Sequence, residues 1–191
     1  MISAADIETL FAAPLSRIRD AGLRRKVVEV YVDACARGGW AQVDDLQRIP
    51  FTLLTHCRGV SYAEHVIAVT EGAVGLAEAM QRAYRQMPIA IDMDRLVAGG
   101  LLHDVGKLLE FESDGAGGCR KSRAGRCARH PISGAILAGR HDLPEEIINV
   151  IACHAKEGDG RHQVIETVLI HQADFATFDP LVMKNDGRLI E

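Results

Sequence analysis

Apolar residues along this chain recur with the spacing of α-helices, and the alternation typical of β-strands is almost absent. The pattern therefore predicts helices over most of the sequence. In chain order they are a short helix behind a capping box of Ser3 and Asp6, one from Leu15 to the Gly38–Gly39 pair, one from His65 that stops before Pro88, one behind a cap at Asp92 or Asp94, and three at 131–140, 144–154 and 163–177.

The segments between these helices suggest how the chain is organised. Residues 40–60 read as a connection packed onto the core, and 112–129 as a long loop. We expect an all-α helical bundle with N-terminal helices at 1–58, a core domain at 59–178 and a loosely held tail at 179–191. Bundles place ligands in the core between facing helices.

Composition bounds the class of protein. The 191 residues are 48% hydrophobic, enough for one sizeable core, and 22 basic against 26 acidic residues give no reason to expect a stable nucleic-acid complex. No apolar stretch approaches the roughly 20 residues of a membrane span, and the N-terminus does not resemble a signal peptide. Five irregularly spaced cysteines indicate reduced thiols. These features predict a soluble, cytoplasmic protein with no membrane partner.

The run LLHDVGKLLEF at 101–111 carries the strongest chemical signal. It places His103 and Asp104 side by side near the end of an apolar helix, with Lys107 one turn further on. An apolar helix does not bury such side chains without a partner. A metal ion supplies that partner for His103 and Asp104; a buried ion pair between Asp104 and Lys107, beside a satisfied histidine, is the alternative.

Further imidazoles and carboxylates recur at the ends or along the apolar faces of other predicted helices. They are His65, His130, His154 and Asp174. Together with the His103–Asp104 doublet they provide enough ligands for two divalent ions. Mixed nitrogen and carboxylate donors suit transition metals such as Fe, Mn, Zn, Ni or Co, rather than Ca or Mg.

The order of these six residues resembles the HD-domain superfamily of metal-dependent phosphohydrolases, in its subgroup with two extra histidines. The resemblance covers roughly residues 60–178. It implies that His65, His103, Asp104 and Asp174 bind a first metal and that His130 and His154 bind a second. Asp104 would then bridge the two ions.

A basic loop leads into His130. No acidic residue stands between Asp114 and Asp142, yet cations are concentrated there. Such a patch would attract an anion and hold phosphate through its side chains, although it also fits a solvated surface loop. The candidate substrate contacts are Lys121, Arg123, Arg126 and Arg129, together with Lys107, which points toward the expected metals.

These features predict a metal-dependent phosphohydrolase acting through a metal-activated water, with Asp104 and Lys107 as catalytic residues. Its substrate would be a phosphoester or phosphoanhydride of a nucleotide or small phosphorylated metabolite. The same ligands also resemble those of mixed-valent diiron oxygenases of the superfamily, and a nucleotide-binding sensor module is a third alternative. The glycine–tyrosine–proline signature of cyclic-diguanylate hydrolases is absent. The N-terminal helices could also form the contact of a homodimer, which the sequence does not decide.

Overall fold

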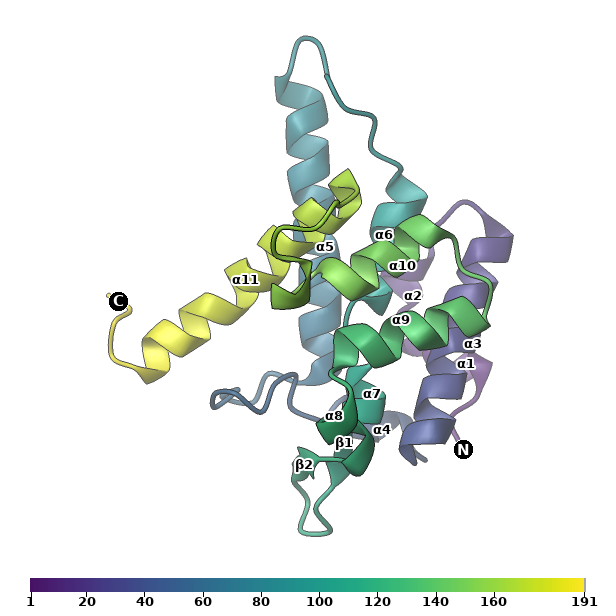
Figure 1. The fold of residues 1–191 in the computed structure, drawn as a ribbon, viewed down its shortest axis with the longest axis vertical. Helices are drawn as coiled ribbons and strands as arrows, with labels where there is room; N and C mark the ends of the chain where they lie inside the picture. The colour runs from purple at the N-terminus through teal and green to yellow at the C-terminus, as the bar shows by residue number, and fades with distance from the viewer. Residues whose placement is uncertain (191) are drawn as a thin grey trace.

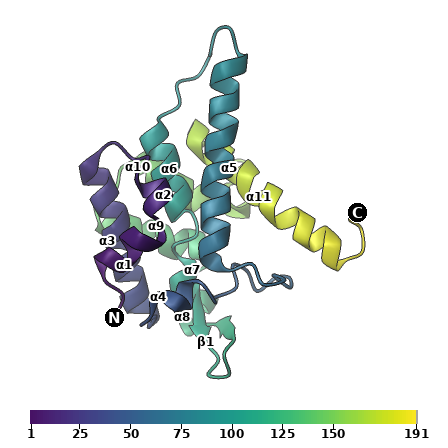
Figure 2. The same cartoon turned by 180° about the vertical axis from the view of Figure 1, so that it is seen from behind.

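The computed structural model describes residues 1–190 and confirms an all-α fold. Helices pack side by side around one hydrophobic core, and the two ends of the described chain lie far apart (Figures 1 and 2). The helices are α1 (Ala4–Leu10), α2 (Ala12–Leu15), α3 (Ala21–Gly38), α4 (Val43–Leu46), α5 (Tyr62–Ala83), α6 (Met93–Leu102), α7 (Lys107–Glu110), α8 (Arg123–Cys127), α9 (His130–Arg140), α10 (Glu145–Cys153), the 3₁₀ turn η1 (Lys156–Gly158) and α11 (Ile165–Asn185).

The N-terminal helices differ in one boundary from the prediction. The capping box of Ser3 and Asp6 is confirmed at the start of α1. The next long helix, α3, begins at Ala21 rather than near residue 15, because the Asp20 side chain caps its first turn and separates it from α2. Gly39 ends α3 in a left-handed conformation, with φ of 78°, as the glycine pair predicted.

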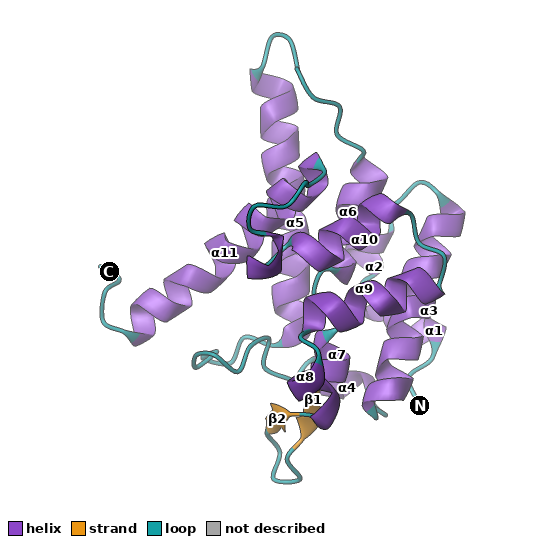
Figure 3. Ribbon diagram, in the orientation of Figure 1, coloured by secondary structure: helices purple, strands orange, loops and turns teal. Residues whose placement is uncertain are grey.

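The segment predicted as a long loop at 112–129 contains regular structure. Strands β1 (Phe111–Ser113) and β2 (Cys119–Lys121) form an antiparallel hairpin, and α8 follows it (Figure 3). The Asp114 carboxylate accepts hydrogen bonds from the backbone of Ala116 and Gly118, which closes the turn. Strands of three residues are too short to show an alternating pattern, so the sequence did not reveal them.

The last helix continues well past the predicted end at residue 177. Helix α11 contains Pro180 and reaches Asn185, whose side-chain amide donates hydrogen bonds to the hydroxyl of Thr55 and the carbonyl of His56. The Arg58 guanidinium donates to the same Asn185 side chain. These contacts join the C-terminal half of α11 to the loop that precedes α5.

Five helices position the site. Helices α5, α6 and α11 pack against one another, α10 packs against α6 and α11, and α9 packs along α10. Gly106, in the turn between α6 and α7, lies directly against the start of α9: a Cβ there would stand 2.1 Å from the carbonyl oxygen of His130. Glycine is therefore required for this approach, which brings His130 to the same point as the His103–Asp104 turn.

Within residues 1–190, no helix combines the length and the apolar character that crossing a membrane requires.

Candidate metal centre

The structure brings all six predicted ligands to one place in the core. Each comes from a different helix or helix end, apart from the His103–Asp104 pair, and all but Asp174 are almost fully buried. His65 lies in the first turn of α5, His103 and Asp104 follow α6, His130 begins α9, His154 follows α10, and Asp174 lies within α11.

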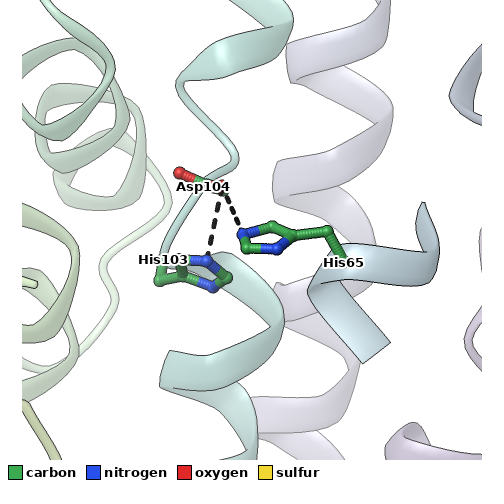
Figure 4. A group of neighbouring side chains, drawn as sticks. All are labelled: His65, His103 and Asp104. Atoms are coloured by element: carbon green, nitrogen blue, oxygen red, sulfur yellow. Dashed lines mark ion pairs between the residues drawn. The ribbon is translucent and has the colours of Figure 1, made fainter. Parts of the chain in front are cut away.

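Asp104 stands at the centre of this group. Its Oδ2 atom is 3.3 Å from His65 Nε2 and 3.4 Å from His103 Nε2, and Figure 4 shows both imidazoles turned toward the carboxylate. Its Oδ1 atom is 3.2 Å from His130 Nε2 and 3.5 Å from His154 Nε2. One carboxylate thus faces two pairs of imidazoles, one pair at each oxygen.

The hydrogen bonds behind these imidazoles fix which ring nitrogen faces Asp104. His103 Nδ1 is 2.6 Å from the carbonyl oxygen of Gly100, and His154 Nδ1 is 2.9 Å from that of Ile151. A carbonyl oxygen only accepts, so each Nδ1 carries the hydrogen and each Nε2 presents a lone pair. These lone pairs point at the Asp104 carboxylate, which also offers only lone pairs.

Such an arrangement leaves buried acceptors without a donor. The Nε2 atoms of His65, His103 and His154 and the Oδ1 atom of Asp104 have no hydrogen-bond partner among the described residues. Buried polar groups without partners are costly, and a cation between the facing lone pairs satisfies all of them at once. The donor chemistry therefore fits a metal ion.

Two overlapping sets of ligand atoms meet the distance requirement for a metal. They are His65, His103 and Asp104, and Asp104, His130 and His154; within each set the ligand atoms lie within 4.8 Å of one another. The Asp174 Oδ1 atom is 3.2 Å from His65 Nε2 and adjoins the first set. These sets could hold divalent ions, with Asp104 common to both.

The charges of the site suit a cation. Burial would raise the pKa of the Asp104 carboxyl, but the Lys107 ammonium and His103 hold that pKa well below its usual range. Burial has the same raising effect on Asp174, yet its contact with His65 brings the pKa to about 2. For His65, burial alone would lower the pKa, and the carboxylates of Asp104 and Asp174 raise it. A proton on His65 would partly occupy the place of a cation.

Glu110 is a residue of the site that the sequence did not single out. Its Oε2 atom accepts a hydrogen bond from the backbone N–H of His130 and lies 2.9 Å from His130 Nδ1, while its Oε1 atom is 3.1 Å from Lys121 Nζ. The sequence did contain an indication of this role, because Glu110 stands three residues after Lys107, on the same helix face.

A cavity of about 620 Å³ opens onto this centre. Lys107, His130 and Asp174 contribute to its lining, so the cavity reaches the ligand cluster. The other lining residues are Phe51, Thr52, Leu53, Leu54, Glu110, Phe111, Lys121, Arg129, Ala155, Lys156, Phe175 and Phe178.

The basic loop contributes only in part to this lining. Lys121 and Arg129 line the cavity, where Arg129 also forms an ion pair with Glu157 at 2.8 Å. Arg123 and Arg126 lie on the exposed α8 helix outside the lining, and Arg126 donates to the backbone carbonyl of Lys121. Lys156, which the sequence did not point out, is a further cation in the cavity.

Comparison with known proteins identifies the fold. A family model described as HD domain matches residues 62–176, the segment that carries all six clustered ligands. The chain belongs to the HD domain family. No solved structure shows a significant match to it.

Two kinds of curated relative are similar to this HD domain chain. Ribonuclease Y of Pseudothermotoga lettingae is 32% identical over 116 residues, which cover 61% of this chain and 18% of the relative. Dihydroneopterin 2′,3′-cyclic phosphate phosphodiesterase of Methanocaldococcus jannaschii is 27% identical over 164 residues, which cover 84% of this chain and 64% of the relative. The chain thus spans less than a fifth of the ribonuclease and under two thirds of the phosphodiesterase.

Proposed function

We propose that this HD domain protein is a metal-dependent phosphohydrolase that cleaves a phosphoester or phosphoanhydride of a small phosphorylated molecule. The observation that carries the proposal is the Asp104 carboxylate, which faces imidazole nitrogens at both oxygens at the end of a cavity lined by lysine and arginine. A cation site beside a positively charged cavity is suited to a phosphate group.

In this proposal His65, His103, Asp104 and Asp174 hold one divalent ion and His130 and His154 the other. Asp104 serves both. When bound, such ions supply a water that ionises near neutral pH and neutralise charge on the phosphoryl oxygens. Imidazole and carboxylate donors favour Fe, Mn, Zn, Ni or Co.

Residues of the chain itself bind and orient the substrate. Lys107 pairs with Asp104 Oδ2 and also lines the cavity, so its ammonium can donate a hydrogen bond to a phosphoryl oxygen placed beside the cluster. Lys121 and Arg129 lie along the lining and add positive charge that attracts the anion. Arg123 and Arg126 are left out of this proposal because they do not reach the cavity.

The two relatives described above support hydrolysis of phosphate esters, since one carries the name ribonuclease and the other cyclic phosphate phosphodiesterase. Neither name suggests oxygenase chemistry. The cavity of about 620 Å³ is the size of a small-molecule site, which favours a small ester over a long polymer.

The test is to measure metal content and phosphate ester hydrolysis on one sample purified without added metal or chelator. We expect about two divalent ions per chain and cleavage of bis(p-nitrophenyl) phosphate or a nucleoside 2′,3′-cyclic phosphate, which a chelator abolishes and added metal restores. Oxygen consumption by iron-loaded protein, with a mixed-valent iron signal, would instead identify a diiron oxygenase. Failure to bind any metal after reconstitution would refute the proposal.

A further inference from the structure

The phenylalanines of this chain are concentrated in the cavity. The sequence contains only five, and four of them, Phe51, Phe111, Phe175 and Phe178, line this one space. The fifth, Phe11, lies in the N-terminal core. Phe111 also belongs to the hydrophobic core, whereas Phe175 and Phe178 do not, so the rings of these two residues are available to an occupant of the cavity.

Three of these rings are arranged outward from the ligand cluster. The Phe51 ring is fully buried and stacks on the ring of His65, with centroids 4.2 Å apart and planes inclined by 20°. Phe178 contacts Phe51 edge-on, with centroids 6.2 Å apart, and is itself partly exposed. Phe175 is also partly exposed and packs against His171. Phe51 therefore covers a ligand, while Phe175 and Phe178 present free surface to the cavity.

The aromatic residues come from two segments that lie beside each other. Phe175 and Phe178 lie on α11, and Phe51 begins the loop whose residues Thr55 and His56 hold Asn185 of the same helix (Figure 1). Leu53 and Leu54 follow Phe51 in this loop, and Leu54 is 80% exposed. We call these five residues, Phe51, Leu53, Leu54, Phe175 and Phe178, the aromatic wall.

Cations come from other segments of the lining. Lys121 lies on β2, Arg129 just before α9 and Lys156 in the η1 turn, and Lys107 lies at the ligand cluster. The carboxylates of Glu110 and Asp174 also line the cavity, so its four cations leave an excess of positive charge. An occupant must therefore carry negative charge that pairs with these cations and must also cover the apolar rings. Inorganic phosphate or a sugar phosphate would satisfy the first requirement and leave the aromatic wall exposed to water.

Aromatic rather than aliphatic chemistry is favoured by the composition of the wall. The core of the protein is built mostly from leucine, valine, isoleucine and alanine, so these residues were available for lining an acyl-chain site. Three of the five wall residues are nevertheless phenylalanines. Flat rings stack in offset or edge-on geometry on other flat rings with a gain beyond simple burial. Lys107 Nζ, 5.7 Å from the Phe51 centroid, keeps positive charge next to the rings.

We propose that the substrate carries a planar aromatic ring system, such as a nucleobase, which stacks on Phe175 and Phe178 while its phosphate lies at Lys107 and the ligand cluster. The proposal rests on the proposed function for the position of the phosphate. Phe175 and Phe178 would then determine substrate specificity. Binding of the ring can be measured separately from hydrolysis of the phosphate ester.

The test is direct binding to the metal-reconstituted chain of 191 residues, measured by calorimetry with adenosine, guanosine and cytidine 5′-monophosphates against ribose 5-phosphate. The nucleotides share the sugar and phosphate of ribose 5-phosphate and differ from it by the ring. We expect at least one nucleotide to bind about ten-fold more tightly or better. Phe175→Leu and Phe178→Leu should each weaken that nucleotide roughly 3- to 10-fold and leave ribose 5-phosphate unchanged.

Tyr84→Leu is the matched control, because Tyr84 is a half-exposed aromatic residue outside the cavity lining. Octyl phosphate is the second control, since an acyl-chain site would prefer it to every nucleotide. Equal binding of nucleotides and ribose 5-phosphate, no detectable binding of either, or preference for octyl phosphate would overturn the inference. None of these results depends on turnover: hydrolysis without ring preference refutes this inference alone, and ring preference without any metal or hydrolysis refutes the proposed function alone.

Discussion

The Glu110 carboxylate contacts His130 at two atoms: Oε2 of Glu110 accepts a hydrogen bond of 2.6 Å from the His130 backbone N–H and lies 2.9 Å from the His130 Nδ1 atom. Burial alone would raise the pKa of Glu110, but these contacts with His130 bring it to about 2. Burial lowers the pKa of His130 to about 4, despite the opposing effect of Glu110. At neutral pH the pair is therefore a carboxylate and a neutral imidazole whose Nε2 lone pair faces Asp104.

Glu110→Gln should weaken the ion at His130 and His154 selectively. A glutamine side chain keeps the size but loses the charge that holds the Nδ1 hydrogen and makes Nε2 a stronger donor. Partners of this kind typically change metal affinity by about 10- to 100-fold. Metal titration followed by calorimetry should show one site weakened by this factor and the other unchanged, with turnover reduced accordingly.

Glu112→Gln is the control for this prediction. Glu112 lies two residues away on β1, where it pairs with Arg120 at the surface. Its substitution should leave both sites and turnover intact. Two unaltered sites in Glu110→Gln would show that Glu110 does not position His130.

Asp104→Ala should remove both metal ions, whereas His154→Ala should remove one. The reason is that Asp104 Oδ2 faces His65 and His103 while its Oδ1 faces His130 and His154. Elemental analysis of the purified variants gives the stoichiometry, and hydrolysis should be undetectable in Asp104→Ala. His56→Ala, in the loop before α5, is the control histidine substitution. Retention of two ions by Asp104→Ala would contradict the shared role of this carboxylate.

The sequence was sufficient to predict the all-α fold and the six residues that cluster. Apolar spacing located α5, α6, α9 and α10, and the HD doublet with its later histidines lay where helix ends converge. Gly106 shows why the meeting of these helix ends could not be derived from the sequence. A glycine is required at this position because the backbone of His130 lies against it, and His130 is 24 positions further along the chain.

Features that depend on tertiary contacts were missed. The hairpin of β1 and β2 is too short for periodicity, and α11 continues through Pro180 to Asn185, where contacts with the loop before α5 support it. The division into residues 1–58, 59–178 and 179–191 stays a prediction. The basic loop was visible as a run of charge, but only folding distinguishes Lys121, inside the cavity, from Arg123, outside it.

Lys107→Met should reduce the turnover number roughly 100-fold or more while metal stoichiometry stays at the wild-type value. The ammonium lines the cavity beside Asp104 and is placed to donate to phosphoryl charge, and removing one preorganised donor typically has an effect of this size. Because Lys107 is itself a cation next to the ligands, its loss should not weaken metal binding. Lys26→Met, on α3 outside the cavity, provides the control. Loss of metal along with activity would assign Lys107 a structural role instead.

Acid should destabilise the metal-free protein through Glu110 in a defined pH range. The pKa of Glu110 is about 2 in the folded protein against 4.5 ordinarily, so its stabilising contribution is fully present above pH 4.5 and is lost as the pH falls toward 2. His130 acts in the same direction at higher pH: its pKa of about 4 in the fold lies below the ordinary 6.5, so unfolding takes up a proton as the pH falls from 6.5 to 4.

The difference in unfolding free energy between wild type and Glu110→Gln isolates the contribution of the Glu110 charge from that of His130. Urea unfolding of chelator-treated protein should show wild type more stable by about 2 kcal/mol at pH 6, with the difference shrinking as the pH is lowered from 4.5 to 3. Protonated glutamic acid resembles glutamine, which is why the two proteins converge. Glu112→Gln should show no such convergence, since its carboxylate lies at the surface. A difference that stays constant from pH 6 to pH 3 would mean that the Glu110 charge does not contribute to folding through His130.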